Sequence, residues 1–206
     1  MMTTQAPTLY VIRHGETDWN IESRMQGRRD IPLNTKGRDQ AQAVGVLLNW
    51  LLPSPLALDF ASSPLIRARE TMEIVRAQLN LPGEQYRADE RLAEISFGTW
   101  EGLRWDEIES RYPATFTRWK EDAFNFQFEK GESYAQAMLR LAYFREDLKR
   151  DTVLVAHAGI IRTLMSLYGC IPYEQAPHLL IPQGQVLMLR PESFCWLKGS
   201  QTPSGN

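Results

Sequence analysis

The sequence predicts an α/β fold of three layers, α/β/α, around a mostly parallel sheet. Four short apolar runs are typical of buried strands, and amphipathic helical patterns lie between them. This alternation places helices on both faces of the sheet, and right-handed crossovers make neighbouring strands parallel. The expected strands are residues 9–12, 58–61, 152–156 and 186–189. With 206 residues, the chain is predicted to form one domain over residues 1–206.

The first two expected helices precede and follow the second of these strands. The first covers residues 37–52, with Asn34 or Thr35 as its N-cap. The second is expected to open at Ser63-Pro64, which would supply a cap and a first-turn proline. Their apolar faces consist of Ala41, Val44, Leu48 and Leu51 in the first helix and of Ala68, Met72, Val75 and Leu79 in the second.

A third helix is expected from Ser133 to about residues 149–151, and a fourth after Gly159. The pattern of the third predicts a buried face that consists of Ala137, Leu141, Phe144 and Leu148.

The segment 100–130 combines many charges with aromatic residues, which predicts an inserted helical cap. Short helices at residues 105–111 and 114–121, interrupted by Pro113, are its expected content. The Ser/Gly/Thr/Gln-rich tail at residues 199–206 is expected to be disordered.

Composition excludes several classes of partner. The chain has 23 basic and 25 acidic residues and a net charge of −2, which disfavours nucleic acid and anionic membranes. Its two cysteines, Cys170 and Cys195, exclude a disulfide framework and a Cys-rich zinc site. No apolar run approaches the roughly 18 residues of a membrane span, and the first residues lack a signal-peptide pattern. We therefore expect a cytoplasmic protein.

Two of the three histidines directly follow predicted strands. His14 comes after residues 9–12 and Arg13, and His157 comes after residues 152–156. Ligands of open α/β sheets bind beyond the carboxyl ends of the strands, so both imidazoles are candidates for chemistry. His178 lies away from any predicted strand end, and we expect it to be a hydrogen-bonded structural residue.

The residues around these strand ends suit a phosphoryl group. Arg13 adjoins His14, and Arg67 lies in the first turn of the expected second helix, so two guanidinium groups could converge on one anion. The helix N-terminus after Ser63 adds backbone N–H donors at the same edge. A neutral imidazole there can attack phosphorus while the arginines and the second imidazole stabilise the equatorial oxygens. The leaving oxygen would still require a proton donor.

A series of motifs resembles, in order, those of the histidine phosphatase or phosphoglycerate mutase-like superfamily. The opening motif of that family is Arg-His-Gly-Glu-Ser/Thr followed by Trp-Asn, and residues 13–20 match it. A short motif counts only with its context, and ordered matches over nearly the whole chain are specific. The further matches are Gln26-Gly27-Arg28 with residues 30–34 and Gly37; residues 62–65 with Arg67, Ala68 and Thr71; residues 92–94 with Phe97-Gly98 and residues 100–102; Gly131-Glu132-Ser133; and residues 153–157 with Gly159 and Arg162.

The resemblance implies the phosphoglycerate mutase-like fold and a role for each matching residue. His14 would be the phosphorylated nucleophile. Arg13, Arg67 and His157 would bind the phosphoryl group, and Asn20 would be a further ligand to it. Neither a metal nor a cofactor is implied.

The resemblance also implies the proton donor. Glu94 would protonate the leaving oxygen and then activate water, a double role that suits a carboxyl group. Glu16 and Glu101 are competing carboxylates, and Glu16 ranks second because it adjoins the nucleophile. Ala158 stands where some members carry Gly, and only its backbone N–H is needed there.

Three functions fit these motifs: hydrolysis, mutase-type phosphoryl transfer, and binding without catalysis. Hydrolysis is favoured. Mutases of this family carry a longer insertion with basic residues, whereas only 28 residues separate Gly102 from Gly131. A binding protein with a dead site would usually lose a histidine, an arginine or the acid, and none is missing. We therefore expect a phosphomonoester hydrolase for a small organic phosphate, and the alpha-ribazole phosphatases are one similar subgroup.

The aromatic residues of the cap are the expected determinants of specificity. They would contact the alcohol portion of the substrate, with Trp105 and Phe126 as candidates, although packing within the cap is the alternative. Assembly as a homodimer is left open.

Overall fold

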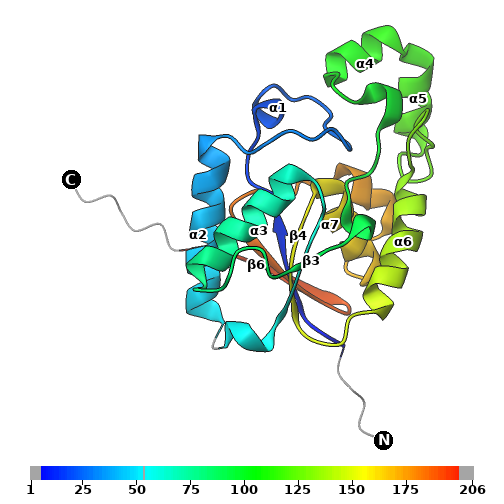
Figure 1. Ribbon diagram of the computed structural model, residues 1–206. Coiled ribbons are helices and arrows are strands. Elements are labelled where there is room, and N and C mark those ends of the chain that lie inside the picture. The colour runs from blue at the N-terminus through cyan, green and yellow to red at the C-terminus, as the bar shows by residue number, and fades with distance from the viewer. Residues whose placement is uncertain (1–5, 53, 200–206) are drawn as a thin grey trace, which may run out of the picture.

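The computed structural model describes residues 6–52 and 54–199 and has the expected three-layer α/β/α architecture (Figure 1). Within these residues, six strands form one sheet in the order β3-β2-β4-β1-β5-β6. The first four of these run parallel, whereas β5 pairs antiparallel with β1, and β6 with β5. The mostly parallel sheet is thus confirmed. Its strands are β1 (Leu9–Arg13), β2 (Asp59–Ser62), β3 (Arg87–Ala88), β4 (Thr152–Ala156), β5 (Val186–Arg190) and β6 (Ser193–Leu197).

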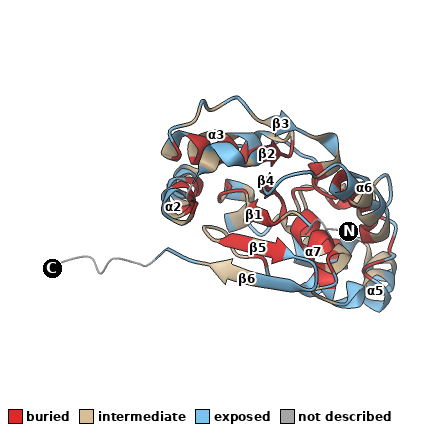
Figure 2. Cartoon of the chain, turned by 90° about the horizontal axis from the view of Figure 1, so that it is seen from below, coloured by how far each residue is buried: buried red, intermediate tan, exposed pale blue. Residues whose placement is uncertain are grey.

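Two of these strands, β3 and β6, have no counterpart among the expected ones. Both residues of β3 are exposed, and β6 lies exposed or half-buried at the other edge of the sheet (Figure 2). β3 has only two residues and therefore shows no apolar run, whereas β6 does contain one at residues 194–197, so its signal was present in the sequence and was missed.

Helices cover both faces of the sheet, and α4 and α5 project beyond one of its ends (Figure 1). The helices are α1 (Asp18–Ile21), α2 (Thr35–Leu51), α3 (Ile66–Gln78), α4 (Trp105–Arg111), α5 (Pro113–Glu121), α6 (Tyr134–Glu146) and α7 (Ala158–Leu167). Short 3₁₀ turns lie at η1 (Pro55–Ala57), η2 (Glu90–Leu92), η3 (Gly98–Trp100) and η4 (Tyr173–His178).

Alternation along the central strands divides the core in two. In β1, Leu9 and Val11 pack with the core beneath α6 and α7, whereas Ile12 packs with the core beneath α2 and α3. Successive side chains of a strand point to opposite faces, so both faces are apolar and both are covered. The expected apolar faces are largely confirmed: Ala41, Val44 and Leu48, then Ala68, Met72, Val75 and Leu79, and Ala137, Leu141 and Phe144 are buried, whereas Leu51 and Leu148 are half-buried.

Two expected helix starts are confirmed. Asn34 caps α2, since its side chain accepts from the N–H of Gly37 at 2.8 Å. Ser133 caps α6 in a reciprocal capping box with Gln136. This helix ends at Glu146, three residues before the expected 149–151.

The start of α3 at Ser63-Pro64 is wrong, because the helix begins at Ile66. Ser63 continues the strand ladder, with its N–H donating to the Val155 carbonyl at 3.0 Å. The Oδ1 atom of Asp30, from a distant loop, accepts from the N–H of Ile66 at 2.6 Å. The cap thus comes from a residue that local sequence does not reveal.

The helical cap is confirmed, with α4 as expected and α5 starting one residue early. Pro113 is the first residue of α5, where a missing N–H costs nothing, and so separates the two helices without interrupting either. Apart from Gly199, the tail expected to be disordered lies outside the described residues.

Across the described residues, no helix is both long and apolar enough to span a membrane. In the same residues, no group of three or more His, Cys, Asp and Glu side chains is placed to hold a metal ion.

Candidate active site

The candidate site lies where β1, β2 and β4 end. His14 follows β1 and His157 follows β4, and the His14 N–H donates to the Ala156 carbonyl at 3.0 Å. Because these strands are parallel neighbours, their carboxyl ends bring residues from distant parts of the chain to one edge.

A pocket of about 530 Å³ opens at this edge. Six of the seven residues expected at the site line the pocket: Arg13, His14, Asn20, Arg67, Glu94 and Ala158. The seventh, His157, is fully buried behind it, with its ring centroid 5.1 Å from that of His14. The structure therefore brings all seven together, with His157 one layer deeper than the others.

The tautomer of His14 follows from its partners. Its Nδ1 lies 2.7 Å from the carbonyl oxygen of Gly15, which can only accept, so Nδ1 carries the hydrogen. Its Nε2 accepts from Nε of Arg67 at 3.3 Å. Burial, followed by the charges of Arg67 and Arg13, holds the pKa of His14 well below its usual 6.5. His14 is thus a neutral imidazole, and the lone pair on its Nε2 could attack an electrophile once the hydrogen bond from Arg67 is released.

Arg67 is fully buried, and each of its guanidinium nitrogens has a partner. Besides the bond to His14, Nη1 donates to the Arg29 carbonyl at 2.7 Å and Nη2 to the Gly27 carbonyl at 2.8 Å. Burial lowers the pKa of Arg67 to about 10, so the group remains charged at neutral pH. Its position is fixed before any ligand arrives.

Arg13 and Arg162 add two further guanidinium groups to the pocket. Nη1 of Arg13 donates to the Ile181 carbonyl at 2.8 Å, whereas its buried Nε has no partner among the described residues. Burial, followed by the charge of Arg162, lowers the pKa of Arg13 to about 10. Arg162 donates to the Leu179 carbonyl and to the Tyr134 hydroxyl.

The pocket carries excess positive charge. Arg13, Arg67 and Arg162 form no ion pair with a carboxylate of the described chain. Their charges are thus not neutralised by an ion pair in a partly desolvated site, where unpaired charge is costly. An anion such as a phosphoryl group would neutralise them.

His157 is held by a residue that follows the neighbouring strand. Its Nε2 lies 2.7 Å from Oγ of Ser63, and its Nδ1 is buried without a partner among the described residues. Burial, followed by the charge of Arg67, holds the pKa of His157 well below 6.5. Both histidines are therefore neutral at physiological pH.

Glu94 lies against the N-terminus of α7. Its Oε1 accepts from the N–H of Ile95 at 2.9 Å and its Oε2 from that of Gly159 at 3.2 Å. A Cβ on Gly159 would lie 2.5 Å from Oε1 of Glu94, so the absence of a side chain there admits the carboxyl group.

The two competing carboxylates do not line the pocket. Glu16 pairs with Lys36 at 2.8 Å, which lowers its pKa. Glu101 accepts from the N–H groups of Arg28 and Phe97 and so joins two loops. Their side chains are committed to structure, which leaves Glu94 as the carboxyl group of the pocket.

Asn20 is fixed by the loop that carries His14. Its Oδ1 accepts from the N–H of Thr17 at 3.1 Å and from Nε2 of Gln183 at 3.1 Å. Nε2 of Gln183 also donates to the His14 carbonyl at 3.1 Å. Nδ2 of Asn20 has no partner in the described chain and remains a donor for a ligand.

The loop of residues 14–17, called the His14 loop below, contacts α2 backbone to backbone. A Cβ on Gly15 would lie 2.2 Å from the Gly37 oxygen, and a Cβ on Gly37 would lie 2.2 Å from the Glu16 oxygen. The N–H groups of Gly15 and Glu16 donate to side chains of α3 and α2, those of Thr71 and Gln40. The loop therefore rests directly on both helices.

Aromatic side chains line the mouth of the pocket. Trp105 of α4 and Trp119 of α5 contact each other with ring centroids 4.9 Å apart, and His178 lies 5.8 Å from Trp119. The expectation of a hydrogen-bonded structural His178 is wrong, since it is exposed at this mouth and has no hydrogen bond among the described residues. Phe126 is buried among cap aromatics and does not line the pocket.

Sequence reasoning missed several residues of the site, for different reasons. Arg162 was among the motif matches but was given no role, although it lies one helical turn after Ala158. Ser63 was assigned to a helix cap, and its proximity to His157 follows only from the strand order. Gln183 and Tyr134 lie in segments without a strand-end pattern, and no local signal distinguishes them.

The architecture and the order of the motifs have close relatives. A model of the histidine phosphatase superfamily (branch 1) matches residues 9–198. The chain belongs to this superfamily. The family predicted from the motifs is thus confirmed, and the histidine phosphatase fold accounts for the sheet order and for the position of the pocket.

Two curated relatives that the chain matches are longer than the chain itself. The 6-phosphofructo-2-kinase/fructose-2,6-bisphosphatase of Gallus gallus is 32% identical over 188 residues, covering 90% of this chain and 38% of the relative. The human 6-phosphofructo-2-kinase/fructose-2,6-bisphosphatase 1 is 30% identical over 190 residues, covering 91% and 38%. The chain therefore spans less than half the length of these curated relatives.

Solved structures match the chain over almost their whole length. The mycobacterial glucosyl-3-phosphoglycerate phosphatase is 30% identical with a TM-score of 0.76, covering 92% of this chain and 95% of that one. A protein from Thermus thermophilus is 33% identical with a TM-score of 0.71, covering 93% and 99%.

Proposed function

We propose that the protein hydrolyses small organic phosphomonoesters through a phosphohistidine on His14. In the first step, Nε2 of His14 attacks phosphorus and the ester oxygen leaves as the alcohol. In the second, water attacks the phosphorus of the phosphohistidine, which releases inorganic phosphate and restores the neutral imidazole.

The observation that carries this proposal is the charge of the pocket around a neutral imidazole. Three guanidinium groups without carboxylate partners line the pocket that holds His14, and one of them, Arg67, contacts its Nε2, while its Nδ1 is held by a carbonyl. Preorganised cations stabilise the charge that gathers on the equatorial oxygens during phosphoryl transfer. Relatives named as phosphatases support hydrolysis.

The remaining residues take the roles that the family resemblance implies. Arg13, Arg67 and His157 bind the phosphoryl group, together with Asn20 and the N–H of Ala158. Glu94, the carboxyl group of the pocket, gives a proton to the leaving oxygen and later takes one from water.

The mouth of the pocket supports a substrate whose alcohol carries a ring. Trp105 and Trp119 offer flat apolar surfaces at the entrance, and aromatic rings of this kind bind sugar and aryl rings by stacking. Sugar phosphates and alpha-ribazole phosphate both belong to this class.

Three earlier expectations are part of this proposal. The chain acts as a single domain, it uses neither metal nor cofactor, and it works in the cytoplasm with both cysteines reduced. The two cysteines at positions 170 and 195 and the balanced charge support the last of these.

The test is a search for the covalent intermediate. Rapid quenching with ³²P-labelled substrate is expected to trap an acid-labile, base-stable phosphoenzyme, and His14→Ala is expected to lack it and to lose several orders of magnitude of rate. Phosphate release across a panel of ring-bearing and linear phosphomonoesters then defines the substrate class. Near-normal turnover by His14→Ala, or efficient interconversion of phosphoglycerates, contradicts the proposal.

A further inference from the structure

Glu94 lies in a segment whose backbone is not held by the hydrogen bonds of a helix or a strand. Residues 93–97 join the turns η2 and η3 and belong to neither a helix nor a strand. A side chain that transfers a proton must be held within about 0.5 Å of its productive position. The contacts that hold Glu94 must therefore come from other parts of the chain.

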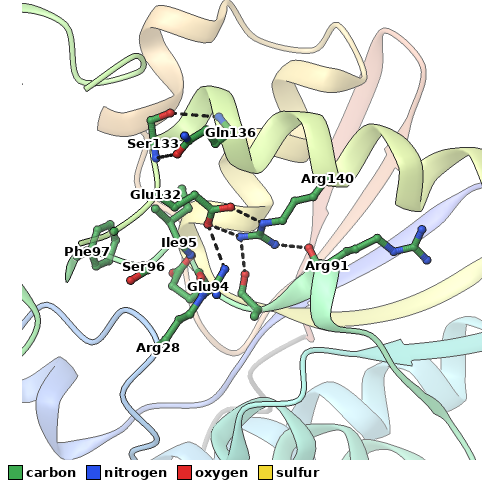
Figure 3. Close-up of polar contacts among 12 residues, drawn as sticks. Arg28, Arg91, Glu94, Ile95, Ser96, Phe97, Glu132, Ser133, Gln136 and Arg140 are labelled. Carbon is green, nitrogen blue, oxygen red and sulfur yellow. Dashed lines mark hydrogen bonds and ion pairs between the residues drawn. The ribbon is translucent and has the colours of Figure 1, made fainter. Parts of the chain in front are cut away.

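Arg140 of α6 holds the backbone before Glu94. Its Nη2 donates to the Ala93 carbonyl at 2.8 Å, and its Nη1 donates to the Arg91 carbonyl (Figure 3). Both carbonyls lie within three residues of Glu94. The guanidinium group therefore holds the backbone before Glu94 in place of the hydrogen bonds of a helix or strand.

Glu132 orients Arg140 and holds the backbone after Glu94. Its carboxylate accepts from Nε and Nη2 of Arg140 at 2.7 and 2.8 Å, a bidentate pair with side chains 14% and 17% exposed. The N–H of Glu132 donates to the Ser96 carbonyl at 2.8 Å. Glu132 thus contacts the segment on the opposite side from Arg140.

Arg28 completes the set from a third part of the chain. Its Nε donates to the Glu94 carbonyl at 3.2 Å, and its Nη2 lies 3.5 Å from Oε2 of Glu132 (Figure 3). The carbonyls of residues 91, 93, 94 and 96 are therefore all occupied by these three residues.

We propose that Glu132 and Arg140 are positioning residues that fix the carboxyl group of Glu94 for proton transfer, with Arg28 in a supporting role. The inference rests on the proposed role of Glu94 as proton donor. It gives a function to Gly131-Glu132-Ser133, one of the motifs for which no chemical role was expected: Ser133 starts α6, and Glu132 orients the arginine two turns along it.

Stability alone is a weaker explanation of this pair. A largely buried ion pair is often no more stabilising than apolar residues of similar volume, because both charges lose their hydration. What an apolar pair could not do is donate hydrogen bonds to the carbonyls of Arg91 and Ala93, which lie just before Glu94.

The experiment compares two aryl substrates that differ in their need for a proton. Phenyl phosphate and p-nitrophenyl phosphate present the same ring to Trp105 and Trp119, but p-nitrophenolate leaves without protonation, whereas phenolate is a poorer leaving group. Because kcat/KM reports the steps up to loss of the alcohol, misplacing Glu94 should affect mainly phenyl phosphate.

The variants are Glu132→Gln and Arg140→Lys, with Glu94→Gln as reference. Glutamine keeps the shape of Glu132, and lysine keeps the charge of Arg140 without its fork. We expect kcat/KM on phenyl phosphate to fall roughly 10- to 100-fold and that on p-nitrophenyl phosphate by less than about threefold.

The matched control is Asp59→Asn, which breaks the exposed ion pair with Arg150 away from the pocket. It is expected to leave kcat/KM unchanged on both substrates. Should the buried variants fail to fold, as judged by thermal unfolding, Arg28→Met makes the same test, because Arg28 is 48% exposed.

The outcomes separate the two proposals. One outcome is that Glu94→Gln lowers kcat/KM on phenyl phosphate much more than on p-nitrophenyl phosphate, while the positioning variants lower both values equally or leave both unchanged. In that case the positioning role is wrong and the proposed function stands. If Glu94→Gln itself shows no discrimination, its role as proton donor is wrong, and the positioning role is wrong with it.

Discussion

Arg67 forms all of its hydrogen bonds with the protein itself: two with loop carbonyls and one with His14. A group held in this way costs little reorganisation when charge develops on phosphorus, and this favours the transition state over the bound substrate. Arg67 is thus expected to act on the chemical step.

The corresponding prediction concerns Arg67→Ala. We expect kcat to fall roughly 10²- to 10³-fold while KM changes by only a few-fold. Arg69→Ala is the control, since Arg69 is exposed on the same helix and pairs only loosely with Glu73. A change confined to KM would place Arg67 on the remote part of the substrate.

Arg13 and Arg67 also predict that the activity does not require a metal ion. Arg13 and Arg67, charged at neutral pH, supply the positive charge that a metal ion provides in other phosphatases. Activity is expected to persist in excess chelator, and vanadate is expected to inhibit competitively as a mimic of the transferring group. Loss of activity in chelator that a divalent metal restores would count against the assignment.

Residue types at strand ends were enough to locate most of the site. His14 and His157 follow apolar runs, and a parallel sheet brings such positions together whatever their separation in sequence. Ser63 shows where this reasoning stops: the same residue type suits a helix cap or a contact to a histidine, and only the order of the strands decides between them.

Among the elements, the cap is where specificity is expected to lie. The sequence placed α4 and α5 almost correctly, because Pro113 and the turn composition are local signals. It did not distinguish aromatic residues at the pocket from those that pack, since Trp119 and Phe126 differ in the direction of their side chains and not in residue type.

We predict that Trp119→Ala changes the ranking of substrates. Removing this ring takes away a contact surface for the alcohol, so activity on ring-bearing phosphates should fall roughly tenfold relative to that on linear ones. Phe126→Ala serves as the packing control, and it is expected to lower the unfolding temperature and keep the ranking. Identical rankings for the two variants would mean that the cap only packs.

Edge elements were the least predictable part of the fold. Central strands are buried on both faces and read as apolar runs, whereas β3 is a two-residue exposed pairing that only its neighbour stabilises. The start of α3 depends on Asp30, some 36 residues away. Such features come from tertiary contacts, and local patterns do not encode them.

For the whole molecule, the two neutral histidines make stability depend on pH. Burial holds the pKa of both His14 and His157 well below 6.5 in the folded state. Below pH 6.5 the unfolded chain therefore binds more protons than the folded one, and the free energy of unfolding decreases as the pH falls.

Each histidine is expected to contribute to this decrease a slope that rises, as the pH falls below 6.5, to at most about 1.4 kcal/mol per pH unit. Urea unfolding from pH 6.5 down to about 5 measures it, above the range in which carboxylates titrate. His157→Asn should remove about half of the slope. A free energy of unfolding that is constant over this range would show that the imidazoles take up protons without unfolding.

The backbone contact between the His14 loop and α2 has a consequence for local unfolding of the molecule. The amide hydrogens of Gly15 and Glu16 are bound to side chains of α3 and α2, so undocking of these helices would break both hydrogen bonds. We therefore expect both amides to exchange with deuterium about as slowly as the helical amides of α2, in one cooperative event. Mass-spectrometric exchange that found this loop opening independently would contradict the coupling; otherwise His14 opens in the same cooperative unit as α2, although it lies in a loop.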